Sequence, residues 1–356
     1  MSKVRNLHDG RSDGLVPLES LDLDKVTSFA DLLKAMSKTA FGGRALGEAL
    51  DVTVAMVKDA DCRVVLTLSG AMTIAKMGKV IQKMIDADMV QAIVSTGALM
   101  AHGLSEAVGL THYRHNPDMS DEELFDKGYN RVYDTLEMEA NLNYVEEFSA
   151  RAIDALGPER ELSSEIVCSA LGKVLAEDPE GSGVLRSAYL KNVPVYVPAF
   201  TDSELGLDLS TWAMKRAQAK GETDSMRLLD AVPRYNPFLD LNSYTKFCLG
   251  AKRLGIFTIG GGVPRNWAQE VAPYIDISNH RLGLSFAPPR YHYAVRICPE
   301  PVHWGGLSGC SYSEGVSWGK FVPPAEGGRF AEVFADATTV WPLLIKGVLE
   351  ELEKGS

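Results

Sequence analysis

Cysteine is scarce in this sequence, and the few cysteines are scattered. There are five among 356 residues, Cys62, Cys168, Cys248, Cys298 and Cys310, and no two of them form a C-x-x-C pair. An odd and dispersed set argues against a disulfide framework and against a zinc site built from thiolates. We therefore expect a protein of a reducing cytoplasm.

Long apolar runs and an excess of positive charge are also missing. No hydrophobic stretch reaches the roughly 18 residues that span a bilayer, and the polar first residues lack the apolar core of a signal peptide. The formal net charge is −11, which argues against binding to nucleic-acid phosphates and favours attraction of small polycations. The sequence thus predicts neither a membrane protein nor a nucleic-acid partner.

Several familiar site motifs are absent as well. The sequence has no G-x-G-x-x-G fingerprint, no phosphate-binding P-loop and no G-x-S-x-G. His112 and His115 have H-x-x-H spacing, but no third ligand is evident near them, so we expect no metal site.

What the sequence does contain is an alternation of strand-like and helix-like segments. Residues 62–68, 71–88 and 89–94 form a first strand–helix–strand unit. Further strands are predicted at 193–200, 256–259, 290–298 and 330–334, and helices at 28–36, 43–58, 121–126, 132–156, 163–177, from 208, at 240–254 and at 338–354. This alternation predicts an α/β fold with a doubly wound, mostly parallel, Rossmann-like sheet and helices on both faces. We expect residues 1–58 to form an N-terminal arm with a helical extension and 59–356 to form a single domain.

Small or acidic residues follow many of the predicted strands. In doubly wound sheets, ligands bind outside the carboxyl ends of the strands. Glycine there lets the backbone approach a pyrophosphate, the next helix N-terminus favours its charge, and a carboxylate can bind ribose hydroxyls. Any one of these glycines could instead serve only a tight turn. Together they predict a dinucleotide site made of Ser69, Gly70, Thr96, Gly97, Asp202, Gly261, Gly262 and Asp336.

The segment SEGVSWGK at 313–320 places Lys320 after a glycine, close to Trp318 and six residues after Glu314. A lysine that attacks a carbonyl or imine carbon has to be neutral part of the time, which a partly desolvated setting favours. The alternative is a solvated surface cation, the usual state of lysine. Glu314 could hold the cationic end of a substrate or be a solvated charge.

Other candidates are open to two interpretations. Trp304 and Trp318 could attract cations or pack in a core. Asn266 could hydrogen-bond a substrate amine or cap the helix that follows Pro264. The histidine His303, like His102, lies near a predicted strand end and could be catalytic or simply hydrogen-bonded.

Several spaced blocks resemble the deoxyhypusine synthase family. EGVSWGK at 314–320, VFADA at 333–337 and WPLL at 341–344 are similar to the C-terminal signature of that family. STG at 95–97, PAFTD at 198–202 and GGGV at 260–263 match further blocks in the same order. The resemblance runs from about residue 60 to the C-terminus.

The resemblance implies a reaction and its residues. In that family NAD oxidises a polyamine carbon to an imine, a lysine captures the butyl group, an acceptor amine takes it over and the stored hydride reduces the product. Lys320 would be that nucleophile, NAD the cofactor, and Glu314 and Trp318 part of the amine channel. The resemblance also implies that residues 59–356 are a single NAD-binding catalytic domain of the deoxyhypusine synthase type and that the protein is a homotetramer.

The sequence departs from the family pattern at the amine end of the site. Asn266 replaces a family histidine, Asp208 follows a leucine that replaces a family acid, and His102 aligns with a family glutamate. His303 and Trp304 lie in HWGGLSG, which replaces an acidic loop. This looks like the bacterial deoxyhypusine-synthase-like branch, whose members make homospermidine or a bis-guanidino triamine from two agmatines. A flat guanidinium could stack on Trp304.

These observations predict an NAD-dependent transferase of polyamine biosynthesis. It would move an aminobutyl or guanidinobutyl group through a Lys320 imine to a small amine acceptor. The candidate substrate residues are Glu314, Trp318, Asn266, Trp304, His303 and Asp208. The alternatives are a deoxyhypusine synthase that modifies a protein lysine and a non-catalytic NAD-binding protein.

Overall fold

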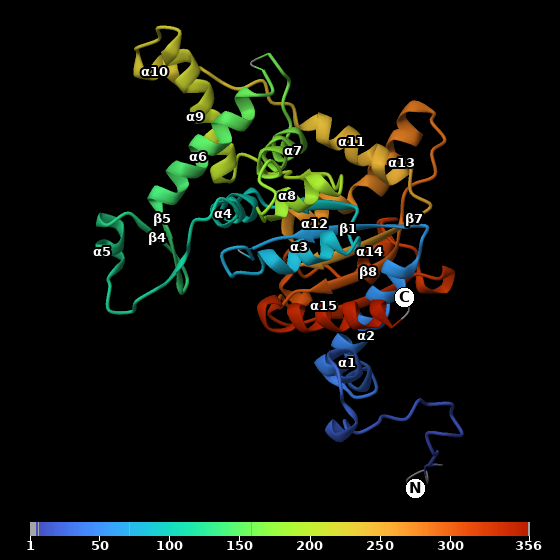
Figure 1. Ribbon diagram of the computed structural model, residues 1–356. Coiled ribbons are helices and arrows are strands. Elements are labelled where there is room, and N and C mark those ends of the chain that lie inside the picture. The colour runs from blue at the N-terminus through green and yellow to red at the C-terminus, as the bar shows by residue number, and fades with distance from the viewer. Residues whose placement is uncertain (1–4, 6, 71, 158, 355–356) are drawn as a thin grey trace.

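A six-stranded parallel sheet forms the centre of the molecule in the computed structural model, which describes residues 5, 7–70, 72–157 and 159–354 (Figure 1). Its strands are β1 (Cys62–Leu68), β2 (Ala92–Ser95), β6 (Val195–Tyr196), β7 (Arg253–Ile259), β8 (Tyr291–Ile297) and β9 (Arg329–Val333). They lie in the order β6-β2-β1-β7-β8-β9. The chain therefore builds outward from β1 in one direction and then in the other, the doubly wound order of Rossmann folds. The predicted fold is confirmed.

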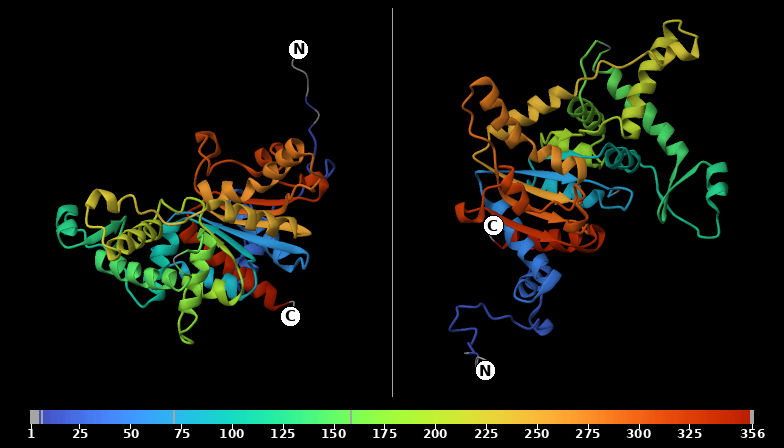
Figure 2. Two further views of the ribbon diagram at one scale, coloured as in Figure 1. Left: turned by 90° about the horizontal axis from the view of Figure 1, so that it is seen from above. Right: turned by 180° about the vertical axis from the view of Figure 1, so that it is seen from behind.

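Helices cover both faces of this sheet (Figures 1 and 2). The α-helices are α1 (Phe29–Ser37), α2 (Phe41–Lys58), α3 (Gly78–Asp86), α4 (Gly97–Ala107), α5 (Asp121–Asp126), α6 (Glu139–Asp154), α7 (Ser164–Leu175), α8 (Val184–Leu190), α9 (Glu204–Ala219), α10 (Ser225–Leu228), α11 (Pro237–Leu249), α12 (Gly262–Gln269), α13 (Val271–Leu282), α14 (Tyr312–Ser317) and α15 (Ala337–Glu353). Short 3₁₀ turns are η1 (Leu23–Lys25), η2 (Val302–Trp304) and η3 (Pro324–Glu326).

The core is divided by the sheet because successive side chains of a strand point to opposite faces. In β1, Leu66 and Leu68 pack in one cluster with α2, α3, α8 and α15, whereas Val65 packs in the other. That second cluster includes Tyr244 of α11 and Tyr312 of α14. Burial on both faces explains why the strand sequences are continuous apolar runs rather than alternating ones.

A second, antiparallel sheet projects from the body together with α5 (Figure 1). It consists of β3 (Tyr113–Arg114), β4 (Tyr129–Val132) and β5 (Thr135–Met138) in the order β3-β5-β4. The predicted helix at 132–156 is therefore wrong over its first residues. Val132 pairs with Thr135 across a two-residue turn in which Tyr133 has a φ of 54°. The β-branched and aromatic residues of this stretch favour a hairpin over a helix.

Other predicted ends of strands and helices differ from the observed ones, next to prolines and at helix caps. The strand predicted at 193–200 is reduced to Val195–Tyr196, between Pro194 and Pro198, which lack the N–H that a ladder needs. Helix α9 begins at Glu204 because the Ser203 side chain accepts the Gly206 N–H. The helix predicted at 71–88 begins at 78, and residue 71 lies outside the described residues.

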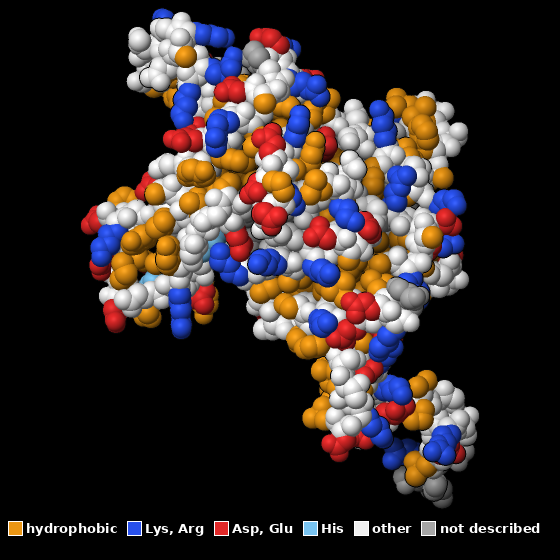
Figure 3. All heavy atoms as spheres, viewed as in Figure 1, with side chains coloured by type: hydrophobic (Ala, Val, Ile, Leu, Met, Phe, Trp, Pro, Cys, Tyr) orange, Lys and Arg blue, Asp and Glu red, His pale blue; other side chains and the backbone are white. Residues whose placement is uncertain are grey.

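The N-terminal part of the chain consists of a helix that packs in the core and an arm that is exposed. Leu46, Leu50 and Met56 of α2 belong to the same core cluster as α15. The preceding arm stands away from the body and carries exposed apolar side chains, among them Leu15 and Val16 (Figure 3).

The structure also bears on the cysteines and on membrane spans. All five cysteines are free thiols, as the sequence predicts. Among the helices of the described residues, none combines the length and apolarity that crossing a bilayer would take.

Candidate active site

The backbone around Lys320 is fixed to the beginning of β8. After α14 the chain reverses at Gly319, whose φ of 69° is left-handed and favours glycine. The Lys320 N–H donates to the Gly315 carbonyl at 3.1 Å, and the Lys320 carbonyl accepts the Tyr291 N–H at 3.0 Å. This reversal turns the lysine side chain inward, and Lys320 is only 7% exposed.

The Lys320 amine meets one face of α12. Nζ donates to Glu270 Oε1 at 2.8 Å and to Asn266 Oδ1 at 3.2 Å. Asn266 and Glu270 are four residues apart, so they present neighbouring side chains at the end of the helix. Nζ also lies 5.8 Å from the centre of the Trp318 ring. The lysine is thus a buried group with an acid beside it and an aromatic face close by.

A cavity of about 260 Å³ opens beside this amine. It is lined by Asn266, Glu270, Val302, Gly305, Gly306, Leu307, Cys310, Glu314, Gly315, Trp318 and Lys320. Four residues that the sequence singled out, Lys320, Asn266, Glu314 and Trp318, therefore meet at one cavity. Glu270 was missed, although its spacing of four from Asn266 on a predicted helix was a usable signal.

Two buried arginines hold the loop that closes this cavity. Arg296 Nη1 donates to the carbonyls of Ser308 and Cys310, each at 2.7 Å, and Arg265 Nη2 donates to the Cys310 carbonyl at 2.7 Å. Arg296 also forms an ion pair with Glu332 at 3.0 Å. The loop that lines the cavity is therefore positioned by charge-assisted hydrogen bonds.

Three other predicted substrate residues lie elsewhere. His303 and Trp304 are exposed residues of η2, Trp304 by 71%, and neither lines the cavity, although their neighbours Val302 and Gly305 do. Asp208 lies on α9. Its pKa is raised to about 7 by burial and by its carboxylate neighbours on α6 and α9.

The predicted cofactor residues gather at the carboxyl edge of the sheet, and two strand ends meet at the switch point between β1 and β7. There the Gly261 N–H donates to Ser69 Oγ at 2.9 Å. Gly260 and Gly262 have φ values of 74° and 60°, and a Cβ on Gly261 would lie 2.6 Å from Ser308 Cα. Helix α12 starts here without a side-chain cap, so its first N–H groups are available to a phosphate.

Residues that follow β2 and β1 also have structural roles that require no ligand. Thr96 caps α4 by accepting the Leu99 N–H at 3.3 Å. A Cβ on Gly97 would lie 2.1 Å from Ser203 Oγ, so close packing alone requires glycine there. Gly70, after β1, has a φ of 73° that a tight turn explains.

The two predicted acidic residues are placed differently. Asp336 caps α15 through Oδ1, which accepts the Thr338 N–H at 2.8 Å, and it lines a cavity of about 500 Å³ together with Lys76 and Tyr133. Asp202 is exposed between β6 and α9. The uncapped start of α12 and the cavity at Asp336 both lie at this carboxyl edge, where doubly wound sheets bind their ligands.

A buried network lies close to the end of β2. The carboxylate of Glu137 on β5 contacts both His102 of α4 and His112, and it accepts a hydrogen bond from Asn141 at 2.8 Å. Burial on its own would raise the pKa of Glu137, but these three hydrogen bonds outweigh it and lower the pKa to about 2. His102, whose role the sequence left open, is thus held by an ionised carboxylate.

Comparison with known proteins agrees with this architecture. The family model described as deoxyhypusine synthase matches residues 31–348. "Probable deoxyhypusine synthase 2" of Methanosarcina acetivorans is 34% identical, over 92% of this chain and 88% of the relative. The "Deoxyhypusine synthase-like protein" of Chlorobaculum parvum is 31% identical, over 92% of this chain and 88% of the relative.

A solved structure shares the fold. The crystal structure of a "putative deoxyhypusine synthase" from Entamoeba histolytica superposes with a TM-score of 0.58 at 14% identity, covering 94% of this chain and 97% of that one. The family model and the sequence relatives span nearly all of the chain, including the Lys320 cavity and the strand ends. This chain belongs to the deoxyhypusine synthase family.

Proposed function

We propose that this protein is an NAD-dependent transferase that moves an aminobutyl or guanidinobutyl group to a small amine acceptor in polyamine biosynthesis, with Lys320 as covalent nucleophile. The observation that carries the proposal is the burial of Lys320 beside a cavity that also presents Glu270, Glu314 and Trp318. The amine has an acid at 2.8 Å, and because the Glu270 side chain is 48% exposed, a proton that this acid takes from Lys320 can pass on to solvent.

In this proposal Lys320 forms and breaks the carbon–nitrogen bonds. Its amine passes a proton to Glu270 and attacks the imine carbon of the oxidised donor. The donor nitrogen takes up a proton and leaves, as ammonia from putrescine or agmatine and as a diamine from spermidine, and the four-carbon group stays on Lys320 as an imine. The acceptor amine then attacks the same carbon, and Lys320 departs with its proton restored. Asn266 keeps Nζ in place through its 3.2 Å hydrogen bond.

NAD would supply the redox chemistry, accepting a hydride from the donor carbon and returning it to the final C=N bond. Ser69, Gly261 and Gly262 would hold its pyrophosphate at the switch point, and Asp336 would face a ribose. Thr96, Gly97, Gly70 and Asp202 would complete the same edge of the sheet. The loop 302–310 connects the two regions, because Ser308 packs on Gly261 and its neighbour Leu307 lines the lysine cavity.

The cavity favours a substrate with one cationic end. Trp318 offers an aromatic face and Glu314 a carboxylate, and the two lie at the same cavity. An ammonium or guanidinium suits both groups. The substrate class is therefore a diamine or a guanidino amine such as putrescine or agmatine.

The proposal also includes the oligomeric state and the cellular compartment of the protein. We expect a homotetramer because the family resemblance implies one. The N-terminal arm, which exposes Leu15, Val16 and Leu18 by more than half, offers an apolar surface suited to packing against another subunit. The free thiols suit the cytoplasm.

Reductive trapping tests the nucleophile. Purified protein with NAD and agmatine, putrescine or spermidine is treated with borohydride, and the intact and peptide masses are measured. Wild type should gain a four-carbon amine adduct on Lys320, and Lys320→Ala should gain none. Lys346→Ala, which changes an exposed lysine of α15, should behave as wild type.

The same experiment separates the alternatives. Wild type that forms no adduct with any of the three amines would support a non-catalytic NAD-binding protein. An adduct from spermidine alone, passed on to a protein lysine but not to a small amine, would support a deoxyhypusine synthase. Turnover of putrescine or spermidine but never of agmatine would exclude the guanidinobutyl form of the reaction.

A further inference from the structure

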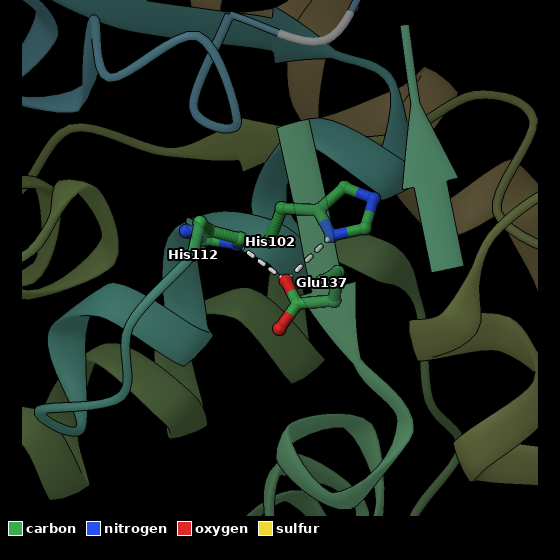
Figure 4. A group of neighbouring side chains, drawn as sticks. All are labelled: His102, His112 and Glu137. Carbon is green, nitrogen blue, oxygen red and sulfur yellow. Dashed lines mark hydrogen bonds and ion pairs between the residues drawn. The ribbon is translucent and has the colours of Figure 1, made fainter. Parts of the chain in front are cut away.

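Three buried side chains from separate parts of the chain meet at one point. His102 comes from α4, His112 from the segment before β3 and Glu137 from β5 (Figure 4). His102 Nδ1 lies 3.1 Å from Glu137 Oε2, and His112 Nε2 contacts the same oxygen. These three atoms lie within 4.8 Å of one another. The residues are 8%, 7% and 0% exposed, so two imidazoles and a carboxylate converge away from bulk water.

The spacing of these atoms suits a metal ion. Ligand atoms about 2.1 Å from a tetrahedral zinc are roughly 3.4 Å apart, close to the 3.1 Å between His102 Nδ1 and Glu137 Oε2. The contact of His112 with Glu137 is that of a hydrogen bond and would lengthen to this spacing. Because Glu137 is ionised, with a pKa lowered to about 2, the histidine nitrogens that face it donate their hydrogens. An ion would take the place of these two hydrogens, and each histidine would carry its hydrogen on the other ring nitrogen.

The surroundings of His102 and Glu137 resemble the outer shell of a metal site. A metal-bound histidine characteristically donates its outer N–H to a carboxylate, which orients the ring. His102 Nε2, the outer nitrogen, lies 3.9 Å from Glu204 Oε1. Among the described residues, Glu204 Oε2 is a buried oxygen without a hydrogen bond, so it has room for a donor. Glu137 is held through its other oxygen, which accepts from Asn141 at 2.8 Å.

Lys76 occupies the outer nitrogen of His112. Its Nζ lies 2.7 Å from His112 Nδ1, and because an ammonium can only donate, that nitrogen accepts. The hydrogen of His112 then stays on Nε2, where an ion would bind. The Lys76 side chain is 45% exposed, and Glu106 Oε1 lies 4.0 Å from its Nζ, so the lysine can turn to Glu106 and release His112. Lys76 therefore competes with an ion for His112.

We propose that His102 Nδ1, His112 Nε2 and Glu137 bind a divalent transition-metal ion, with zinc as the best fit. Two imidazoles and one carboxylate, with a water in the fourth position, are a ligand set of zinc, whereas magnesium and calcium prefer oxygen alone. The ion would fix β5 of the projecting sheet to α4 of the body. The site is separate from the cavity at Lys320, since none of its three ligands lines that cavity.

Metal binding to the full-length protein tests this site without any assay of activity. The protein is purified without a histidine tag and without chelator, and its metal content is measured. The metal is then removed with a chelator, and Co²⁺ is titrated while its visible absorption is recorded. We expect about one Co²⁺ per chain.

Substitutions at the site should change the Kd for Co²⁺ in two directions. His112→Gln and Glu137→Gln, which remove direct ligands, should each raise it more than about 100-fold, and Glu204→Gln, which removes only a support of His102, about 10-fold. Lys76→Met should instead lower the Kd about 10-fold, because it removes a cation that repels the ion and keeps the hydrogen on His112 Nε2.

Matched controls come from the same chain. His115→Gln changes the other histidine of the H-x-x-H spacing, which is not among these ligands, and His280→Gln changes an exposed histidine of α13. Both should bind Co²⁺ as wild type does. Circular dichroism of the metal-free variants shows whether each folds. If the buried ligand variants do not fold, Lys76→Met still tests the site, because its side chain is partly exposed.

X-ray absorption of the zinc-loaded wild type counts the ligands directly. Two imidazoles and no sulfur per zinc are expected, whereas a single imidazole or a thiolate ligand would overturn this assignment. Wild type that binds no stoichiometric Co²⁺ would also overturn it. So would weaker Co²⁺ binding by Lys76→Met, or binding by folded His112→Gln that is as tight as that of wild type.

Discussion

Glu270 accepts a hydrogen bond from the Lys320 amine at 2.8 Å, and it is the acid closest to the proposed nucleophile. Because general acid–base groups contribute about 10²- to 10⁴-fold to rate, Glu270→Gln should lower turnover by that order. A glutamine can still hold the amine but cannot take its proton. Steady-state turnover with NAD and agmatine or putrescine measures the effect.

Asp276→Asn is the matched control, because Asp276 is an exposed carboxylate on the following helix, α13. It should retain wild-type turnover. If Glu270→Gln retained it too, Glu270 would only position the lysine, and the proton of Lys320 would have to go elsewhere.

Arg296 is expected to matter for stability and for the shape of the cavity. Its buried guanidinium holds the Ser308 and Cys310 carbonyls and pairs with Glu332. Removing one partner of a buried pair is strongly destabilising, so Arg296→Met should lower the free energy of unfolding by about 3 kcal/mol. Urea unfolding followed by circular dichroism measures it.

An exposed ion pair supplies the comparison. Arg290 and Glu326 are 3.2 Å apart with side chains 41% and 55% exposed, so Arg290→Met should cost less than about 1 kcal/mol. Equal effects of the two substitutions would mean that the loop does not depend on Arg296.

The sequence allowed the sheet to be predicted because parallel strands buried on both faces are continuous apolar runs. Five of the six strands lie close to their predicted positions, from Cys62–Leu68 to Arg329–Val333. The hairpin at 129–138 was missed because it borders a helix and its register depends on a turn at Tyr133. Lys320 was recognisable from its local motif. By contrast, Glu137 reaches His102 from 35 residues away, and only the missed hairpin brings the two together.

Gly97 should tolerate no side chain. An added Cβ would lie 2.1 Å from Ser203 Oγ and 2.4 Å from Ser203 Cβ, and overpacking of this kind typically costs about 1 to 3 kcal/mol. Gly97→Ala should therefore lower the melting temperature, and it should weaken NAD binding if this strand end holds the cofactor. Differential scanning fluorimetry with and without NAD measures both.

Substitution of Gly42 by alanine should change the melting temperature in the opposite direction. It lies in the first turn of α2 with no atom within 4 Å of an added Cβ. Alanine favours a helix over glycine by about 0.5 to 1 kcal/mol, so Gly42→Ala should raise the melting temperature slightly. If Gly42→Ala lowered the melting temperature as much as Gly97→Ala did, contact with Ser203 would not be the cause of the destabilisation by Gly97→Ala.

Asp59 should make stability depend on pH below neutrality. It ties the first residues of β7 to β8, because its Oδ2 accepts from Arg253 at 2.6 Å and from the Tyr293 hydroxyl at 3.1 Å. Burial would raise the pKa of Asp59, but the hydrogen bonds from Arg253, the Asp61 backbone and Tyr293 together lower it below its usual value. A carboxylate with a depressed folded pKa stabilises the protein above its unfolded pKa of about 3.9 and loses this contribution as the pH falls through the folded value.

The Asp59→Asn variant should therefore unfold at a lower urea concentration than wild type at pH 7, and the difference between the two should shrink below about pH 4. Urea titrations between pH 7 and pH 3 measure this, with Asp276→Asn expected to follow wild type throughout. A difference that stayed constant with pH would show that Asp59 stabilises the strands by shape and hydrogen bonding alone, without its charge.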